Sequence, residues 1–281
     1  MSIAGQPGIT PATIIRPPTG WAALRLAELW EYRELLYFLT KRELQIRYKQ
    51  SVVGVSWAVL QPVLLAFIFT VFFGVLAEIP SDGHPYALFA MAGLVPWLFV
   101  SQTVAQSAGS LVGDANLLTK VYFPRLVIPL AKALALLVDL VIALGVLLAV
   151  ALLYGEMPGP ETLAMPVFLI LGLVTGVGLG ILLAAANVQY RDIGLVTPLL
   201  IQVWLFATPV IYPGSLVTGD WQYLFALNPM VAVVEGVRWC VFGDSAPDPL
   251  AVGISATVAL GLLALGIGYF RRTELFFADI V

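Results

Sequence analysis

Two places in this chain hold charged residues inside apolar sequence, where acids and bases acquire unusual chemistry. Glu235 and Arg238 stand three residues apart, so a helix would put them on neighbouring faces as an ion pair. Asp139 lies near the middle of a long apolar run, where a charged carboxyl costs about 2.5 to 3.5 kcal/mol on insertion scales. Lys132, on the same helix face, is its nearest candidate partner within that helix. Asp139 is either a structural polar contact or part of a proton relay, and a relay with one acid is the weaker interpretation.

The residues needed for metal, nucleophilic or nucleotide chemistry are missing from the sequence. The chain has a single His and a single Cys, Cys240, so neither a metal cluster nor an intrachain disulfide is expected. No GxxxxGK[ST], HExxH or GxSxG pattern occurs, and the scattered acids lack the spacing for acid–base catalysis. We therefore expect a protein that is not an enzyme and binds no cofactor of its own. Transport is the class of function that is left.

The composition is that of an integral membrane protein. Of the 281 residues, 60% are hydrophobic and 11% are charged, whereas about one quarter of the residues in soluble domains are charged. Six apolar runs are each long enough for a helix to cross a hydrocarbon core of about 30 Å. We predict an all-α membrane fold with six transmembrane helices, at residues 52–77, 85–112, 126–154, 163–188, 193–212 and 249–270.

The positions of the basic residues predict the orientation of these helices. Nearly all Lys and Arg residues fall at one side of the six runs, and that side is expected to be cytoplasmic. Both termini then lie in the cytoplasm, and Arg238 is the one basic residue left outside. No removable signal peptide is visible, so the first transmembrane helix is expected to direct insertion.

The segments that flank the transmembrane domain, residues 51–272, have their own composition. Residues 1–20 are rich in proline and are expected to form a poorly ordered cytoplasmic tail, and residues 273–281 a second, shorter one. Residues 21–50 carry apolar side chains at helical spacing among many charges, and we predict an amphipathic helix in the membrane interface. The alternative is a helix that packs on a soluble cytoplasmic partner. In either case, the basic end of the segment at residues 21–50 would be attracted to anionic lipid headgroups.

Several side chains within the runs are expected to face something other than lipid. Phe69, Phe72 and Phe73 follow helical spacing and would share one face, which is more typical of packing or lipid contact than of a ligand path. Gly172 and Gly176 would permit another helix to approach closely. The second run contains a series of polar residues, namely Ser101, Gln102, Thr103, Gln106, Ser107 and Ser110. Because these groups are costly in lipid, we expect them to face protein or a watery path.

The loop at residues 113–125 combines charged with apolar side chains. Asp114 is a plausible N-cap for a short helix within it. The side chains that we expect to be exposed include Leu117, Leu118, Lys120, Tyr122, Phe123 and Arg125. Exposed aromatic rings between charges suggest docking on a partner protein, and the alternative is a loop that lies on lipid headgroups.

Four motifs in the chain match a known pattern. In order they read RELQIRYKQSVVGVSWAVLQPVL, LLTKVYFPRLVIPL, NVQYRDIG, and TPVIYP followed by ALNPMVAVVEGVRWCVFG. Together they resemble the permease subunits of bacterial ABC-2 type exporters of polysaccharides such as O-antigen, capsule or teichoic acid. The resemblance runs from about Arg42 to Arg272 and is more specific to the family than to the substrate.

The resemblance implies a half-transporter of the bacterial inner membrane that pairs with a second copy of itself. ATP and Mg would be bound by a separate ATPase dimer, the substrate would be an undecaprenyl-linked glycan, and no nucleic acid is expected as a partner. By analogy with the family, the residues that contact the ATPase would include Glu31, Arg33, Asp114, Lys120, Tyr122, Phe123 and Arg125. The corresponding aromatic lining of the channel would be Phe69, Phe72, Phe73, Trp204 and Phe206. The alternatives are an ABC-2 exporter of drugs or lipids, and a proton-coupled secondary transporter that uses Asp139.

The stretch from Phe206 to Phe242 is apolar but too often interrupted by Pro and Gly to cross a membrane. Since the charges put it outside, we expect a re-entrant hairpin at about residues 213–243. Its two short helices would cover residues 214–226 and 229–241. The residues expected at its turn and in its ion pair are Asn228, Pro229, Glu235 and Arg238. We interpret this hairpin as the outer gate of a glycan channel.

Overall fold

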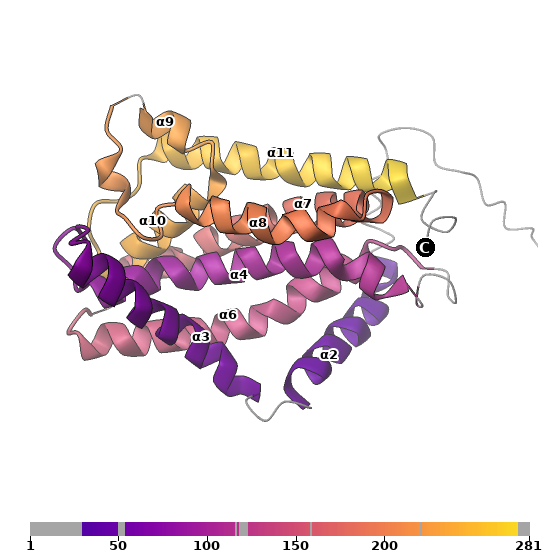
Figure 1. The fold of residues 1–281 in the computed structure, drawn as a ribbon, viewed down its shortest axis with the longest axis horizontal. Helices are drawn as coiled ribbons and strands as arrows, with labels where there is room; N and C mark the ends of the chain where they lie inside the picture. Colours follow the sequence, from indigo (N-terminus) through magenta and orange to yellow (C-terminus); the bar gives the residue numbers. More distant parts are fainter. Residues whose placement is uncertain are drawn as a thin grey trace, which may run out of the picture.

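The computed structural model describes residues 30–49, 54–115, 117, 123–157, 159–219 and 221–274, and within these ranges the chain is helical and has no strand (Figure 1). The longer helices are α2 (Arg33–Lys49), α3 (Gly54–Phe69), α4 (Tyr86–Gly113), α6 (Val127–Leu153), α7 (Met165–Gln189), α8 (Asp192–Phe206), α10 (Pro229–Phe242) and α11 (Pro249–Thr273). The shorter ones are a π-helix at Thr70–Leu76, 3₁₀ turns at Pro160–Ala164 and Gly214–Leu216, and α9 (Trp221–Phe225). The all-α prediction is confirmed.

Five helical segments in the described ranges are long and apolar enough to cross a membrane. They are Ser56–Leu76, Tyr86–Gly113, Val127–Leu153, Pro160–Gln189 and Pro249–Thr273. Each overlaps one of the six predicted spans.

The predicted span at residues 193–212 has a different form. It contains α8, which has 15 residues and is therefore only about 22 Å long. The chain continues from Ala207 in turns that include Pro209 and Pro213, and these prolines prevent the helix from extending. The count of six transmembrane helices is therefore not confirmed by helix length, which supports five full-length spans and one shorter apolar helix.

Helix α4 forms the centre of the bundle. Leu88, Val100 and Leu111, near its two ends and its middle, are all fully buried. In Figure 1 it lies between α6 and α8, and it also packs along α7. Four of the polar residues predicted to avoid lipid, Ser101, Thr103, Ser107 and Ser110, are buried in it against protein. This arrangement confirms the prediction that they face protein.

Small residues of α7 allow its two neighbours to approach closely. A Cβ atom on Gly172 or Gly176 would come within 3.1 Å of side chains on α4, namely Val100 and Thr103. On the other side, a Cβ on Gly178 would lie 2.7 Å from the backbone nitrogen of Leu263 in α11. The small-residue pattern predicted for the fourth span therefore serves two helix contacts.

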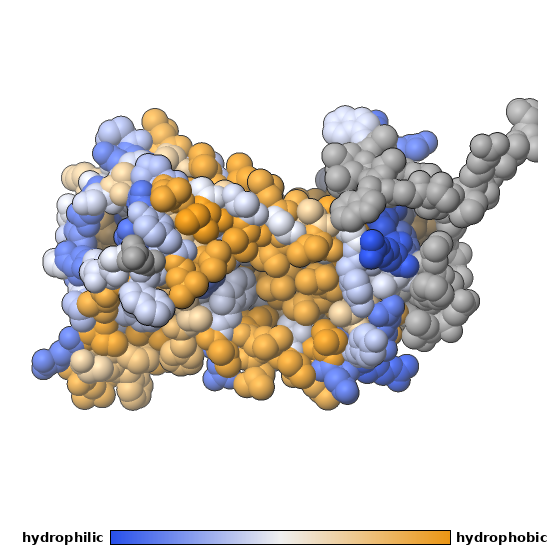
Figure 2. Space-filling model, turned by 90° about the horizontal axis from the view of Figure 1, so that it is seen from above, coloured by the Kyte–Doolittle hydropathy of each residue, from blue (hydrophilic) through white to orange (hydrophobic). Residues whose placement is uncertain are grey.

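The surface of the bundle is divided as expected for a membrane protein. Figure 2 shows apolar side chains over the central part of the long axis and hydrophilic residues toward both ends. Exposed apolar residues on several helices contribute to this belt, among them Phe67, Val141, Leu199, Val203 and Leu265. Such an apolar belt is favourable in contact with lipid and unfavourable in contact with water.

Helix α2 packs against the bundle on its leucine side. Leu35, Leu36 and Leu39 contact the buried cluster formed around Phe123 and Leu126, whereas Tyr37 and Phe38 are exposed. In Figure 1 it slants away from α6, and α3 slants in the opposite direction. The two-sided pattern of α2 agrees with an amphipathic helix. Residues 1–29, which include the predicted tail, and residues 275–281 lie outside the described ranges.

Candidate functional site

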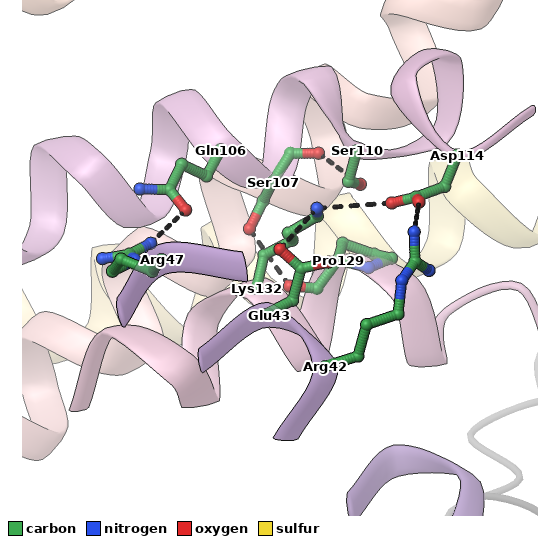
Figure 3. Close-up of polar contacts among 9 residues, drawn as sticks. All are labelled: Arg42, Glu43, Arg47, Gln106, Ser107, Ser110, Asp114, Pro129 and Lys132. Atoms are coloured by element: carbon green, nitrogen blue, oxygen red, sulfur yellow. Dashed lines mark hydrogen bonds and ion pairs between the residues drawn. The ribbon is translucent and has the colours of Figure 1, made fainter. Parts of the chain in front are cut away.

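A network of charged side chains joins α2 to α4 and α6. The Arg42 guanidinium donates to Oδ1 of Asp114 at 3.1 Å, and Nζ of Lys132 lies 3.3 Å from Oδ2 of the same carboxylate. Nζ of Lys132 also lies 2.8 Å from Oε2 of Glu43. Figure 3 shows the lysine between the two acids, with Arg42 reaching Asp114 from the other side. These contacts connect α2 directly to the end of α4 and to the second turn of α6.

Asp114 follows α4 directly and is buried. Its carboxylate is occupied by Arg42 and Lys132, so the structure gives it the role of an ion-pair acceptor rather than that of a side-chain helix cap. Its backbone oxygen does accept from the N–H of Leu117, as expected where a new turn begins. Most of the predicted short helix lies at residues outside the described ranges.

Asp139 pairs with α2 and not with its own helix. Its carboxylate accepts hydrogen bonds from the guanidinium of Arg47 and from the hydroxyl of Tyr48. The second terminal nitrogen of Arg47 donates to Oε1 of Gln106 at 2.6 Å. The expectation that Lys132 is the partner of Asp139 is wrong, because two helical turns separate the two residues by about 10 Å and nearer acids neutralise the lysine. The contacts support a structural role for Asp139.

Phe123 is not exposed as the sequence suggested. Only 7% of its surface is accessible, and it packs in a cluster with Leu111, Val127 and Phe270. The prediction failed because α2 and α11 cover a loop that sequence alone leaves open. Lys120 and Tyr122 lie outside the described residues, as does Leu118.

The other residues assigned to the cytoplasmic contact have mixed surroundings. The Arg125 guanidinium donates to the backbone oxygen of Glu274 at 2.6 Å, which ties this loop to the end of α11. Glu31 and Arg33 are exposed near the start of α2, and the Arg33 guanidinium lies 5.5 Å from the Trp30 ring. These two residues are thus accessible to a partner. Their contact with an ATPase stays a prediction.

At the opposite end of the bundle, Arg238 is the centre of a compact cluster. It donates to Glu235 at 2.9 Å, which confirms the predicted ion pair. It also donates to the backbone oxygens of Val210 at 2.9 Å and Tyr212 at 3.3 Å, and it lies 3.6 Å from the Phe89 ring centroid. The guanidinium is buried. It therefore holds α10, α4 and the segment after α8 together.

The segment from Gly214 to Ala226 differs from its prediction. Instead of one short helix it contains a 3₁₀ turn at Gly214–Leu216, irregular backbone up to Gly219 and the five residues of α9, and Asp220 lies outside the described residues. Gly219 has a φ of +67°, which a regular right-handed helix does not allow. The second predicted helix is present as α10, and the side chain of Asn228 caps it by accepting from the N–H of Met230 at 3.1 Å.

Trp204 belongs to the same end of the molecule and is held by two contacts. Its indole N–H donates to Oδ1 of Asn228 at 2.9 Å, and its ring packs edge-on against Trp97 with centroids 5.2 Å apart. The amide nitrogen of Asn228 donates to the backbone oxygen of Ala207 and to the Thr208 hydroxyl, both at 3.0 Å. The turn predicted at Asn228 and Pro229 is thus fastened to the end of α8.

The three phenylalanines of the first span do not form one even stripe. Phe69 packs edge-on against Phe73 with centroids 5.3 Å apart, and both are half-buried. Phe72 is 57% exposed. The shared-face prediction is wrong for Phe72, because the chain changes from α- to π-helix at Thr70 and a π-helix has more residues per turn. Phe206, at the end of α8, is also 57% exposed.

Sequence reasoning missed the contacts of the single histidine. His84 lies within hydrogen-bonding distance of two acids from other loops, with Nδ1 3.0 Å from Glu156 and Nε2 2.7 Å from Asp244. Its ring stacks on Phe242 at 4.0 Å. Burial lowers the pKa of His84, but the two carboxylates together outweigh it, so the net pKa is raised above 6.5. The three residues are far apart in the chain, and no local pattern signals their meeting.

Comparison with known proteins agrees with this architecture. The sequence profile of the ABC-2 type transporter family matches residues 34–242, and the chain belongs to that family. An O-antigen export system permease protein from Myxococcus xanthus is 33% identical over 251 residues, which cover 88% of this chain and 96% of the relative. An O-antigen export permease from Klebsiella pneumoniae is 26% identical over 249 residues, 88% of this chain and 95% of the relative. A polysialic acid transport protein from Escherichia coli is 25% identical over 239 residues, which cover 83% of this chain and 91% of the relative.

Proposed function

We propose that this chain is the transmembrane subunit of an ABC exporter that moves a lipid-linked polysaccharide of the O-antigen, capsule or teichoic acid type across the bacterial inner membrane. The observation that carries the proposal is the 33% identity to an O-antigen export permease over 96% of that protein's length. The polysialic acid transport protein supports the broader substrate class of surface polysaccharides. A bundle with an apolar belt fits a subunit that spans the membrane.

A separate ATPase subunit would supply the energy, since the sequence contains no phosphate-binding loop. Its contact surface would include Glu31 and Arg33, which are accessible at the start of α2. Movement of α2 would reach the transmembrane helices through Lys132 and Asp114, because both residues bind α2 side chains. A rigid-body shift of each permease half would then follow closure of the ATPase dimer.

The permease would act as a homodimer with its channel between the two copies. The first span, made of α3 and the π-helix that continues it, and helix α8 carry exposed apolar and aromatic side chains, among them Phe72 and Phe206. Such faces suit either lipid or a second copy. We assign these two faces to the channel and the subunit contact. Trp204, with its ring on Trp97 and its N–H on Asn228, would support the channel wall rather than bind substrate directly.

Both termini would lie in the cytoplasm. The first residues of α2 and the last turn of α11 are at the same end of the bundle (Figure 1), and that end carries Arg42, Lys132 and Arg271. An excess of basic residues favours the cytoplasmic side. The Arg238 cluster is then at the outer end, where the segment between α8 and α10 would form the outer gate.

Deletion of the gene in its natural host tests the substrate class. Lipid-linked polymer should accumulate inside the cell and surface polysaccharide should disappear, and a plasmid copy of the gene should restore both. Normal surface polysaccharide in the deletion strain would overturn the proposal. Separately, the tagged chain should co-purify with an ABC ATPase, and lipid-linked glycan should stimulate hydrolysis by the complex more than hydrophobic drugs do.

A further inference from the structure

A cavity of about 300 Å³ lies where α2, α3, α4 and α6 meet. Its walls include Arg47, Trp57, Gln61, Gln102, Gln106 and Asp139. On α4, the two glutamines are roughly 10 and 17 Å from the cytoplasmic end of the helix, counted at 1.5 Å per residue. The rest of the wall is apolar and includes Val95, Leu98, Phe99 and Leu136. The cavity therefore combines a few polar groups with a mainly apolar wall, and its volume is at the lower end of the range for small-molecule sites.

The two charges of the cavity neutralise each other. Arg47 binds Asp139 and also donates to Gln106, and Tyr48 donates to the same carboxylate. Because the guanidinium and the carboxylate are paired, neither sign of charge is in excess on the wall. An anionic ligand such as a phosphate would have to compete with Asp139 for Arg47, and a cation would have to compete with Arg47 for Asp139. The site therefore favours an uncharged ligand.

The three glutamines present both donors and acceptors to the chamber. The amide nitrogen of Gln102 donates to the carbonyl oxygen of Gln61 at 3.2 Å, and the carbonyl oxygen of Gln106 accepts from Arg47. Neither of these two contacts uses the Gln61 or Gln106 amide nitrogen or the Gln102 carbonyl oxygen, and all three side chains are half-buried. Hydroxyl groups both donate and accept, so a ligand with several hydroxyls matches this mixed set, whereas a phosphate only accepts.

Trp57 adds an apolar surface to these polar groups. It is 54% exposed, although it lies on the cavity wall near the start of α3. An indole combines a flat apolar face with one N–H donor. A pyranose ring has the complementary form, with C–H groups on its faces and hydroxyls around its edge. Aromatic side chains beside a few convergent polar groups are the usual lining of small-molecule sites.

We propose that this cavity binds the uncharged, hydroxyl-rich headgroup of a lipid, with a sugar ring over Trp57 and its hydroxyls on Gln61, Gln102 and Gln106. Two sources share this chemistry, a sugar ring of the lipid-linked glycan that is exported and the headgroup of a resident glycolipid. The first source rests on the proposed function. The binding itself does not.

The test uses the full chain in lipid nanodiscs with two fluorescent probes, a monoglucosyl diacylglycerol and a phosphatidic acid of the same acyl chains. The glucosyl lipid should bind more tightly than phosphatidic acid, and Gln61→Leu and Gln102→Leu should each weaken it about three- to tenfold because each removes a hydrogen bond. Trp57→Leu should weaken binding of the glucosyl lipid more than either glutamine variant does. The control is Thr257→Val at an exposed position of α11, which should bind as the wild type does.

Equal binding of the two probes, or unchanged glucosyl-lipid binding by both glutamine variants, would overturn the proposal. If Gln102→Leu fails to fold, Gln61→Leu decides the question. If both variants fail to fold, a soluble alkyl glucoside should displace the glucosyl lipid from the wild-type chain, and no displacement would overturn the proposal. Expression of the binding-defective variants in the deletion strain then distinguishes the sources. Lost export assigns the cavity to the exported glycan, and normal export assigns it to a resident lipid. A wild-type gene that does not restore surface polysaccharide contradicts the proposed function but leaves the binding result intact.

Discussion

Nζ of Lys132 lies 3.3 Å from Oδ2 of Asp114, and this contact connects α6 to the end of α4 at the point where Arg42 of α2 also arrives. Replacement of the lysine by Met leaves Asp114 with one cation and Glu43 without its ion-pair partner. We expect Lys132→Met to lower the free energy of unfolding by about 1.5 to 3 kcal/mol, the range for hydrogen bonds to charged groups. Thermal unfolding of the purified chain in nanodiscs measures the change.

The exposed Lys49 at the end of α2 offers the matched control, and Lys49→Met should unfold like the wild type. If the network transmits force, Lys132→Met should also reduce export while the ATPase still co-purifies. Unfolding of both variants at the wild-type temperature would contradict a stabilising role for the network.

Substitution of Arg238 should be the most damaging single change at the outer end. Arg238→Met removes an ion pair, two bonds to backbone oxygens and the contact with Phe89 from a buried site. Breaking a buried pair costs about 3 to 5 kcal/mol. Arg238→Lys should recover only part of this, because one ammonium group lacks the forked geometry of the guanidinium.

The control for Arg238 is Arg272→Met, at an exposed position in the last turn of α11, where stability should change little. The measurement is the unfolding temperature of all three variants under the same conditions. A value for Arg238→Met within the error of that for Arg272→Met would refute the account of the cluster.

Trp204 should stabilise the fold through its hydrogen bond to Asn228. Trp204→Phe keeps an aromatic ring against Trp97 but removes the N–H that Asn228 accepts, so we expect a loss of about 1 kcal/mol. Phe206→Leu, at an exposed ring two residues away, should leave stability unchanged. If α8 lines the channel, export should nevertheless fall for Phe206→Leu. Equal unfolding temperatures for Trp204→Phe and the wild type would show that the indole N–H contributes nothing.

His84 should make stability depend on pH. Since its pKa is raised above 6.5 in the folded chain by Asp244 and Glu156, the protonated ring stabilises the fold. This contribution is fully present below about pH 6.5 and is lost as the pH rises through the higher pKa of the folded state. Unfolding temperatures should therefore fall as the pH rises above about 6.5, and His84→Gln should flatten this part of the profile. An identical slope in the variant would assign the dependence to other groups.

The sequence by itself determined the class of this protein. Long apolar runs lead to helices because backbone groups in lipid must be satisfied within one segment, and the spacing of polar and small residues predicts which faces are covered. For this reason the helical fold, the burial of Ser107 and Ser110, and the pair of Glu235 and Arg238 could all be predicted from local patterns. The order of four motifs was sufficient to indicate the family.

Only the tertiary structure decided which charges meet. Asp139 pairs with Arg47 rather than with Lys132, Phe123 is covered by other helices, and His84 joins acids from two distant loops. These contacts are between residues far apart in the chain. The Asp139 pair depends on how α2 lies against α4 and α6, whereas the His84 contacts depend on how three loops meet. Local periodicity predicts which face of a helix is covered but not which neighbour covers it. The charged network and the cavity beside it therefore follow from the packing of the helices.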